Sequence, residues 1–254
     1  MGKSDRSKDP EKNQIPRPVP GQLVMGHFLE RPNRFVAIVE VEGNARRCHM
    51  PNPGRMREFM VTGTPLLLQD RRGKGGKTEF QVQGVWYHNQ WISLVSTLGN
   101  HVIREMIEKG QLEEFGGHRK VTSEYTFGNS RFDLAVELHS KRALIEIKSC
   151  TLVEDGVARF PDAPTTRGAR HMRELSEALN KGWESWVIIF IPRNDAHIFE
   201  PNRDTDPDFA RAFEDAIVSG VRPLAIKFRF DGESFDFLGR VPVRPNLPTN
   251  TPTV

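Results

Sequence analysis

The sequence is poor in cysteine and has no long apolar run. Its two cysteines, Cys48 and Cys150, form no CxxC pair and no metal-type spacing with histidine. We therefore expect buried free thiols, and neither a disulfide framework nor a zinc site. No stretch approaches the roughly 20 apolar residues of a membrane helix, and the polar N-terminal residues lack the apolar core of a secretory signal. We expect no membrane association and a cytoplasmic location.

Charge is nearly balanced overall but unevenly distributed. The 254 residues carry a formal net charge of +3, and 37% of them are hydrophobic, which is ordinary for a globular protein. Residues 1–97 hold 15 Lys and Arg against 9 Asp and Glu, whereas residues 98–243 hold 20 against 24. A basic first part favours partners that carry phosphate, and an acidic pocket in the second part could hold a cation. The alternative is that both are solvated surfaces.

The first part of the chain is dominated by strand patterns. Residues 1–20 are rich in Lys, Asp and Pro without periodicity, and we predict a disordered arm there. After it, apolar, β-branched and aromatic residues predict strands at 22–29, 34–42, 45–50, 64–70, 78–87 and 91–97. So many short strands predict that residues 21–97 form a small closed barrel of the OB-fold type.

From residue 98 to 243 the pattern becomes mixed α/β. Apolar residues at helical spacing predict helices that begin at Leu98 and at 166, and a third at 207–219. Strands are expected at 120–126, 131–138, 142–149, 186–192, 223–230 and 235–241. The run "WVIIFIP" at 186–192 is typical of a strand buried on both faces. We predict a mixed sheet flanked by helices, followed by a flexible tail at 244–254.

The predicted hairpin "SRFDLAVELHSKRALIEIKSC" at 130–150 places charged residues among apolar ones. Because side chains alternate along a strand, Glu146 and Lys148 share one face of the second strand. On the first strand, Asp133 is expected opposite a common face formed by Phe132, Leu134 and Val136. With the turn near residue 140, Asp133 approaches Glu146 and Lys148.

Two carboxylates that converge repel each other unless a cation lies between them. Mg²⁺, or Mn²⁺ in its place, suits Asp133 and Glu146, because Mg²⁺ takes one or two carboxylates together with water and substrate phosphate. Lys148 could neutralise a phosphate or steady an attacking hydroxide. The hypothesis is a metal-dependent phosphodiester site with Asp133, Glu146 and Lys148 as catalytic residues.

The alternative is a plain surface salt bridge between Glu146 and Lys148, worth at most about 1 kcal/mol. The context favours the functional interpretation. The three residues fall on the second and third strands of an αβββαβ unit, which is the arrangement of PD-(D/E)xK nucleases. We therefore expect a PD-(D/E)xK nuclease-like domain over 98–243.

Other polar residues are candidates for the same site. Glu124, on the strand before Asp133, could add a catalytic carboxylate, and Glu105 on the first helix could do so too; the alternative for both is a solvated surface. Arg167 and His171 are four residues apart near a helix N-terminus, where phosphate binds readily. Helix capping and salt bridging are the alternative for this pair.

The predicted barrel carries basic residues interleaved with aromatic ones, as a platform for single-stranded nucleic acid does. The candidate nucleic-acid contacts, with those of the second domain included, are Arg34, Arg46, Arg47, Arg55, Arg131, Arg167 and His171. Most of the aromatic side chains are expected in the barrel core instead. The segment "CHMPNPGRM" at 48–56 predicts a rigid turn that presents Arg55, either to phosphate or as a structural corner.

Three stretches in this order resemble the sugar fermentation stimulation protein A (SfsA) family: "CHMPNPGRM", "SRFDLAVEL" and "IEIKSCTLVEDGVARFPDAPTTRGARHMREL". The resemblance extends over about residues 22–243. It implies an N-terminal OB-fold, a PD-(D/E)xK nuclease-like domain, DNA binding without marked sequence specificity and a regulatory link to sugar metabolism. Carried over by motif, the nuclease-like residues are Asp133, Glu146 and Lys148, with Glu124 and Arg167 beside them.

Three functions remain open from the sequence. The chain could be a DNA-binding protein whose nuclease fold serves binding or regulation. It could be a working Mg²⁺-dependent nuclease, which the intact set of Asp133, Glu146 and Lys148 favours. It could also be a sugar-responsive module whose cleft binds a small metabolite: Trp86 and Trp91 could stack on a sugar ring, although packing in the core explains them better.

Overall fold

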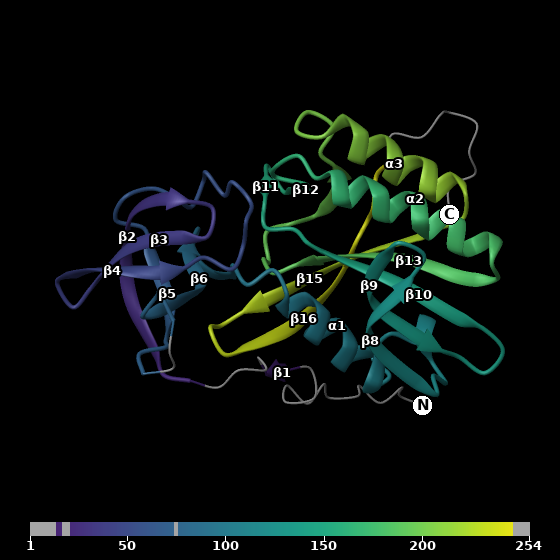
Figure 1. The fold of residues 1–254 in the computed structure, drawn as a ribbon, viewed down its shortest axis with the longest axis horizontal. Helices are drawn as coiled ribbons and strands as arrows, with labels where there is room; N and C mark the ends of the chain where they lie inside the picture. The colour runs from purple at the N-terminus through teal and green to yellow at the C-terminus, as the bar shows by residue number, and fades with distance from the viewer. Residues whose placement is uncertain (1–13, 17–20, 74–75, 246–254) are drawn as a thin grey trace, which may run out of the picture.

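The computed structural model describes residues 14–16, 21–73 and 76–245. In Figure 1 they form two lobes side by side, a barrel of strands and a larger sheet with helices on both faces. The predicted fold class, an all-β first part followed by a mixed α/β part, is confirmed. Within the described residues no helix is both long and apolar enough to cross a membrane.

The two segments for which we predict disorder, 1–20 and 244–254, lie largely outside the described residues. The parts of them that are described make contacts. Strand β1 (Gln14–Pro16) pairs antiparallel with β16 (Ser234–Val241), and Ile15 is fully buried. The backbone N–H of Arg244 donates to the carbonyl of Phe199 at 2.9 Å. The apolar side chain of Ile15 therefore holds one piece of the N-terminal segment against the sheet.

The first lobe is a closed five-stranded barrel. Its strands are β2 (Leu23–Asn33), β3 (Val36–Val41), β4 (Asn44–His49), β5 (Pro65–Asp70) and β6 (Phe80–Tyr87). Neighbours pair antiparallel in the order β4-β3-β2-β5-β6, and a parallel pairing of β4 with β6 closes the ring. Buried and less buried residues alternate along β3, as expected for a strand with one face toward a barrel interior.

The second lobe is a mixed sheet. Its strands are β8 (Lys120–Phe127), β9 (Ser130–Glu137), β10 (Arg142–Ser149), β13 (Trp183–Ile191), β15 (Arg222–Phe230) and β16. Strands β10, β13 and β15 are parallel at the centre, with β9 and β8 on one side and β16 on the other. Strand β7 (Gln90–Ser93) joins the lobes, because it pairs with β6 and, through Trp91, with β15.

Helices cover the two faces of this sheet and enclose two cores (Figure 1). Helix α1 (Leu98–Glu108) and the short helix η2 (Glu113–Phe115) lie on one face, and α2 (Thr166–Asn180) and α3 (Pro207–Val218) on the other. Strand β13 contributes Ile188 and Phe190 to the first core and Val187 and Ile189 to the second. The run at 186–192 is thus buried on both faces, as its composition predicts.

A small second sheet is absent from the sequence-based prediction. It consists of β11 (Val153–Glu154), β12 (Val157–Phe160) and β14 (Ile198–Pro201), in that order. Each strand has at most four residues, too few for a period-two pattern to show. This sheet lies beside the barrel in Figure 1, so the segment that follows β12 reaches the boundary between the lobes.

Hydrogen bonds tie the lobes together at that boundary. Asp162, which follows β12, accepts the backbone N–H of Met56 in the barrel at 3.2 Å. Arg193 is buried and donates to the carbonyl of Thr151 at 2.7 Å, while its guanidinium faces the ring of Phe59 in the barrel at 5.8 Å. Asp162 and Arg193 of the second lobe therefore hold the barrel in a defined position against the sheet.

Gly54 lies where this junction leaves no room for a side chain. A Cβ atom at this position would lie 2.6 Å from Oδ1 of Asp162. The N–H of Gly54 donates to Oδ1 of Asn52 at 2.9 Å, which holds the loop in its turn. The glycine in "CHMPNPGRM" thus allows a carboxylate from the other lobe to approach the loop backbone.

We expect Gly54→Ala to lower the free energy of unfolding by about 1–3 kcal/mol, because the added methyl group overlaps the Asp162 carboxylate. Urea unfolding measures this cost, and the same substitution in an Asp162→Ala background serves as the control. Removal of the carboxylate should reduce the cost of the alanine to less than half. An equal cost in both backgrounds would show that Asp162 is not what Gly54 accommodates.

Candidate active site

Asp133 takes over the role of a strand partner where β9 and β10 separate. The two strands pair from Arg142 opposite Glu137 to Ile145 opposite Leu134. Beyond that point the N–H of Ile147 donates to Oδ2 of Asp133 at 2.7 Å instead of to a carbonyl on β9. Oδ1 of the same carboxylate accepts from Nδ2 of Asn100, near the start of α1, at 2.6 Å. Three elements therefore fix the position of this carboxylate.

The side chains of β8 and β9 exchange faces at the level of Asp133. Glu124, which stands opposite Asp133 in the register of the two strands, has a φ of +55°. Val121 packs in the core beneath α1, whereas Tyr125 and Phe132 pack in the core beneath α2. The prediction that Phe132 shares a face with Leu134 and Val136 is therefore wrong, because β9 breaks its alternation at Asp133, opposite the left-handed residue of β8.

Glu146 is 3% exposed and lies at the centre of a cluster of polar side chains. Its Oε1 accepts from Nζ of Lys148 at 2.6 Å and lies 2.6 Å from Nδ1 of His171. The His171 contact is too poorly aligned for a hydrogen bond. Its Oε2 is buried and has no hydrogen-bond partner among the described residues. A buried carboxylate oxygen without a partner is costly unless another group satisfies it.

The two carboxylates differ in their ionisation. Burial, together with the charge of Glu146, raises the pKa of Asp133 from 3.8 to about 6, against the effect of its hydrogen bond from Ile147. Burial would also raise the pKa of Glu146, but the charge of Lys148 and the contact with His171 outweigh it and lower that pKa. Glu146 is thus held ionised, and Asp133 is the carboxyl group of the pair whose protonated form is favoured.

His171 contacts Glu146 from the buried face of α2 and does not reach the surface. It is 1% exposed, and its Nε2 accepts from Nε of Arg167 at 3.2 Å. Because Arg167 donates to Nε2, we assign the ring proton to Nδ1, which faces Glu146. The prediction that His171 contacts nucleic acid is corrected accordingly. The i,i+4 spacing does bring Arg167 and His171 together, but the histidine belongs to the buried face of α2.

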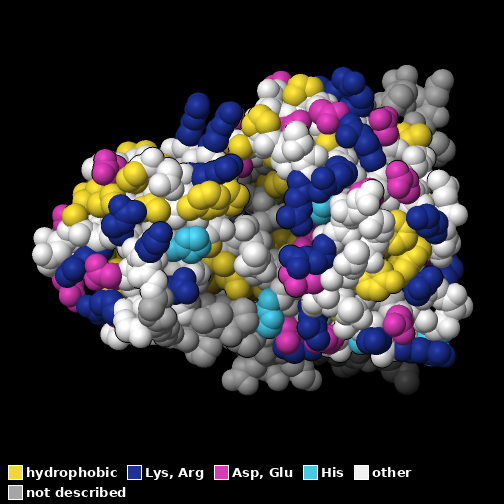
Figure 2. Space-filling view, viewed as in Figure 1, with side chains coloured by type: hydrophobic (Ala, Val, Ile, Leu, Met, Phe, Trp, Pro, Cys, Tyr) yellow, Lys and Arg dark blue, Asp and Glu magenta, His cyan; other side chains and the backbone are white. Residues whose placement is uncertain are grey.

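The cluster opens into a pocket of about 410 Å³ at the junction of the lobes. Asp133, Glu146 and Lys148 line it from the second lobe, and Arg34 and the loop 52–54 line it from the barrel. Figure 2 shows the hollow between the lobes, with Lys and Arg side chains along its edge on the second lobe. Neither lobe alone forms this pocket.

The remaining candidate residues lie at different distances from the pocket. Arg167 lines it, whereas Glu124 is not among the lining residues. The side chain of Glu124 is 67% exposed and pairs with Arg131 at 3.5 Å. Glu105 also lies outside the lining and pairs with Lys109 at 3.1 Å. The structure thus brings Asp133, Glu146 and Lys148 together and does not add either further glutamate.

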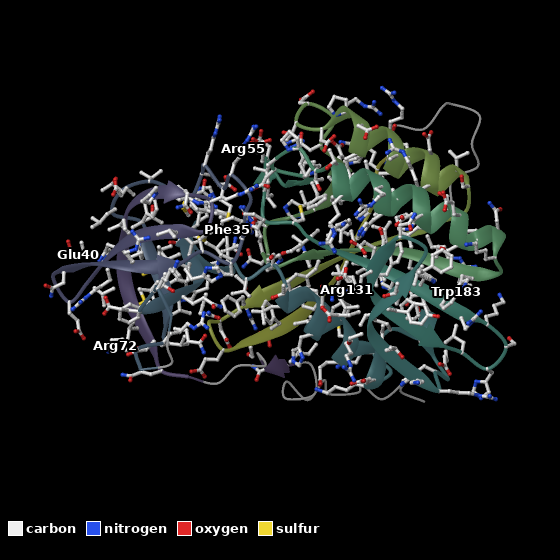
Figure 3. All side chains as sticks on the ribbon, in the orientation of Figure 1. Phe35, Glu40, Arg55, Arg72, Arg131 and Trp183 are labelled. Atoms are coloured by element: carbon white, nitrogen blue, oxygen red, sulfur yellow. The ribbon has the colours of Figure 1, made fainter. Side chains whose placement is uncertain are left out.

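The basic residues of the barrel divide in the same way. Figure 3 shows Arg55 on the side of the barrel that faces the second lobe, next to the loop that lines the pocket. Arg46 pairs with Glu79 at 3.4 Å, and Arg47 is exposed on the same strand, β4. Neither Arg46 nor Arg47 lines the pocket. Among the barrel arginines that we predict to bind nucleic acid, Arg34 and Arg55 are therefore best placed.

Two residues that sequence reasoning missed shape the pocket. Arg31 donates from Nη1 to the carbonyls of Gly54 and Arg55, and from Nη2 to those of Arg34 and Asn52. Asn100 holds Asp133, as described above. An arginine before a turn and an asparagine in the first turn of a helix carry no distinctive pattern, so only the tertiary arrangement identifies them.

The two carboxylates fit a hard divalent cation that keeps several water ligands. The described residues contain no cluster of three or more His, Cys, Asp or Glu side chains suited to a metal, so a cage made entirely of side chains is excluded there. Mg²⁺ does not need one, since it is usually held by one or two carboxylates, water and substrate phosphate. Oε2 of Glu146, buried and without a partner in the described part of the chain, is the atom that such an ion would satisfy.

Two family models match nearly the whole chain. The "SfsA N-terminal OB domain" matches residues 29–94, and the "Sugar fermentation stimulation protein RE domain" matches residues 97–234. A sugar fermentation stimulation protein homolog of Natranaerobius thermophilus is 40% identical over 87% of this chain and 94% of its own length. One of Methanothermobacter thermautotrophicus is 38% identical over 78% of this chain and 83% of its own length.

A solved structure is similar over most of the molecule. The structure of Pyrococcus furiosus SfsA in complex with Ca²⁺ is 28% identical in sequence and superposes with a TM-score of 0.82. The match covers 91% of this chain and 99% of the other. Both the barrel and the mixed sheet are therefore shared, and the relative carries a divalent cation.

We expect Asp133→Asn to raise the stability of the metal-free protein near pH 8. The raised pKa of Asp133 means that folding favours its protonated form, so stability falls as pH rises from 3.8 through about 6. An amide has no charge to lose and should be more stable than the wild type by up to about 3 kcal/mol above pH 7. The gain should vanish near pH 4.

Urea unfolding in the presence of a chelator measures this difference across the pH range. Glu105→Gln serves as the control, because it removes a carboxylate that pairs with Lys109 outside the pocket. An Asp133→Asn protein that is less stable than the wild type at pH 8 would contradict the account of two repelling carboxylates.

Proposed function

The chain belongs to the SfsA family, and from that premise we propose that it binds DNA at the junction of its lobes and hydrolyses phosphodiester bonds there with a divalent metal. Its architecture, an OB domain followed by a restriction-endonuclease-like domain, combines two folds that serve nucleic acids. DNA binding is the broader part of the proposal, and hydrolysis is the more specific part.

The observation that carries the proposal is the state of Glu146. Its side chain is buried, lines the pocket and is held ionised by Lys148 and His171, and its Oε2 has no partner among the residues that the structure describes. Asp133 supplies a second carboxylate, fixed by Ile147 and Asn100. A purely structural ion pair would satisfy these oxygens within the protein, whereas a metal site leaves one of them available.

Asp133 and Glu146 would hold the ion, and Mg²⁺ or Mn²⁺ is expected. A bound divalent metal supplies Lewis acidity toward a phosphoryl oxygen and lowers the pKa of bound water. The relative from Pyrococcus furiosus was solved with Ca²⁺, which supports the choice of a hard cation. Hard cations bind preferentially to oxygen ligands such as carboxylates.

The neighbouring cations have separate roles in the proposal. Lys148 has three N–H donors, and its contact with Glu146 leaves others to hold a phosphoryl oxygen or an attacking hydroxide. Arg34 lines the pocket from the barrel and Arg167 from the second lobe, and both would neutralise phosphates next to the reacting one. Arg55 would extend the contact along the strand.

A second candidate is DNA binding without hydrolysis, in a regulatory role for sugar metabolism. The observation that favours it is the close pairing of Lys148 with Glu146 at 2.6 Å, which compensates the buried charge without a metal. A sugar-responsive module has no comparable support, since Trp86 and Trp91 pack on each other at 5.3 Å outside the pocket.

The test is cleavage of labelled single-stranded, duplex and branched DNA with Mg²⁺, with Mn²⁺ and with a chelator. We expect metal-dependent cleavage by the wild type, and a loss of at least about a hundredfold in Asp133→Ala and in Lys148→Met, which remove a metal ligand and the cation beside the phosphate. Glu124→Gln, outside the pocket, is the matched control and should cleave normally.

Two other outcomes would contradict hydrolysis at this site. DNA binding by the wild type with no cleavage of any substrate in either metal would eliminate hydrolysis and favour the regulatory candidate. Cleavage that survives in both Asp133→Ala and Lys148→Met would place the reaction elsewhere in the molecule.

A further inference from the structure

Phe35 is an exposed aromatic side chain next to Arg34, which lines the pocket. It is 49% exposed, and Figure 3 shows it on the side of the barrel nearest the second lobe. Single exposed apolar residues are common and need no explanation by themselves. What distinguishes Phe35 is its neighbour, because Arg34 lines the pocket that contains Asp133 and Glu146.

The backbone around Phe35 is fixed by hydrogen bonds on every side. Its N–H donates to Oδ1 of Asn33 at 2.9 Å, and its carbonyl accepts from the N–H of Met50 at 2.8 Å. The carbonyl of Arg34 accepts from Nη2 of Arg31 at 2.8 Å. The guanidinium of Arg34 lies 5.0 Å from the centroid of the Phe35 ring. The ring is therefore held in place while much of it stays accessible.

The pocket itself is too small for a double helix. Its volume of about 410 Å³ is near the lower end of sites for small molecules, about 300–1,000 Å³. Its two walls belong to different lobes, and the hydrogen bond of Met56 to Asp162 and the contact of Arg193 with the ring of Phe59 hold these walls together. A single strand can thread a backbone phosphate into a pocket of this size more easily than a rigid duplex can.

We propose that the site takes an unpaired DNA strand, with one base stacked on Phe35 while the adjoining phosphates contact Arg34 and the Asp133–Glu146 cluster. This inference rests on the proposed function and specifies its substrate. Bases stack on aromatic side chains whatever their sequence, and arginine assists through its planar charge. A protein partner would need a larger apolar surface than one ring beside an arginine.

The direct test is binding of a 20-nucleotide single strand and of the matching duplex, measured by fluorescence anisotropy in Ca²⁺ at one fixed salt concentration. Phe35→Ala is compared with the wild type. Trp86→Ala is the matched control, because Trp86 is 40% exposed in the same barrel but has no pocket-lining residue beside it in the chain. Phe35→Trp tests rescue, since it restores a stacking surface.

We expect the single strand to bind more tightly than the duplex. Phe35→Ala should weaken single-strand binding about tenfold, in line with the loss of one stacked base. Trp86→Ala and Phe35→Trp should change it less than twofold, and all variants should unfold at the temperature of the wild type. Equal affinity for single strand and duplex, or an unaltered affinity in Phe35→Ala, would overturn the inference.

Failure of this inference can be told apart from failure of the proposed hydrolysis. Cleavage of closed circular duplex as fast as of single strands, dependent on Asp133 but indifferent to Phe35→Ala, would refute the substrate assignment and leave hydrolysis intact. Preferential, Phe35-dependent binding of single strands without any cleavage would refute hydrolysis and leave the stacking site intact.

Discussion

Repulsion between two buried carboxylates is the constraint around which this site is built. Asp133 and Glu146 come from neighbouring strands, and burial in the sheet strengthens the interaction between their charges. Lys148 and His171 stabilise the charge on Glu146, while Ile147 and Asn100 donate hydrogen bonds to Asp133. These partners offset burial and repulsion only in part, since both still raise the pKa of Asp133, and Oε2 of Glu146 has no partner within the described residues. The remaining imbalance is what makes a cation the natural occupant.

The barrel matters to this chemistry because it supplies the second wall of the pocket. Arg31 binds four backbone carbonyls and so gives the loop 52–55 its shape. Gly54 lets Asp162 approach that loop. Arg34 and Phe35, which contact each other, lie in the turn beside it. A nuclease-like sheet alone would expose its carboxylates on an open edge. With the barrel attached, they line a pocket that has a second wall.

Much of this arrangement follows from the sequence. Short β-rich segments predict the barrel, the continuous run at 186–192 predicts a doubly buried strand, and the hairpin pattern predicts that Asp133, Glu146 and Lys148 meet. The failures have physical causes. Alternation breaks at Glu124 of β8, which has a positive φ, and at Asp133 of β9, so Phe132 packs in the other core. The strands of the small sheet are too short to leave a pattern. Burial of His171 and the hydrogen bonds of Arg31 and Asn100 depend on contacts between distant segments, which one sequence does not reveal.

The most direct test of the central claim is a calorimetric titration of the metal-free protein with Mn²⁺, comparing the wild type with Glu146→Gln. The account predicts saturable binding of a divalent ion by the wild type, and its loss in the variant, because the amide removes the charge that the unpartnered oxygen offers to the ion. Equal binding by both proteins, or none by the wild type, would contradict the claim that the buried carboxylate pair forms a metal site.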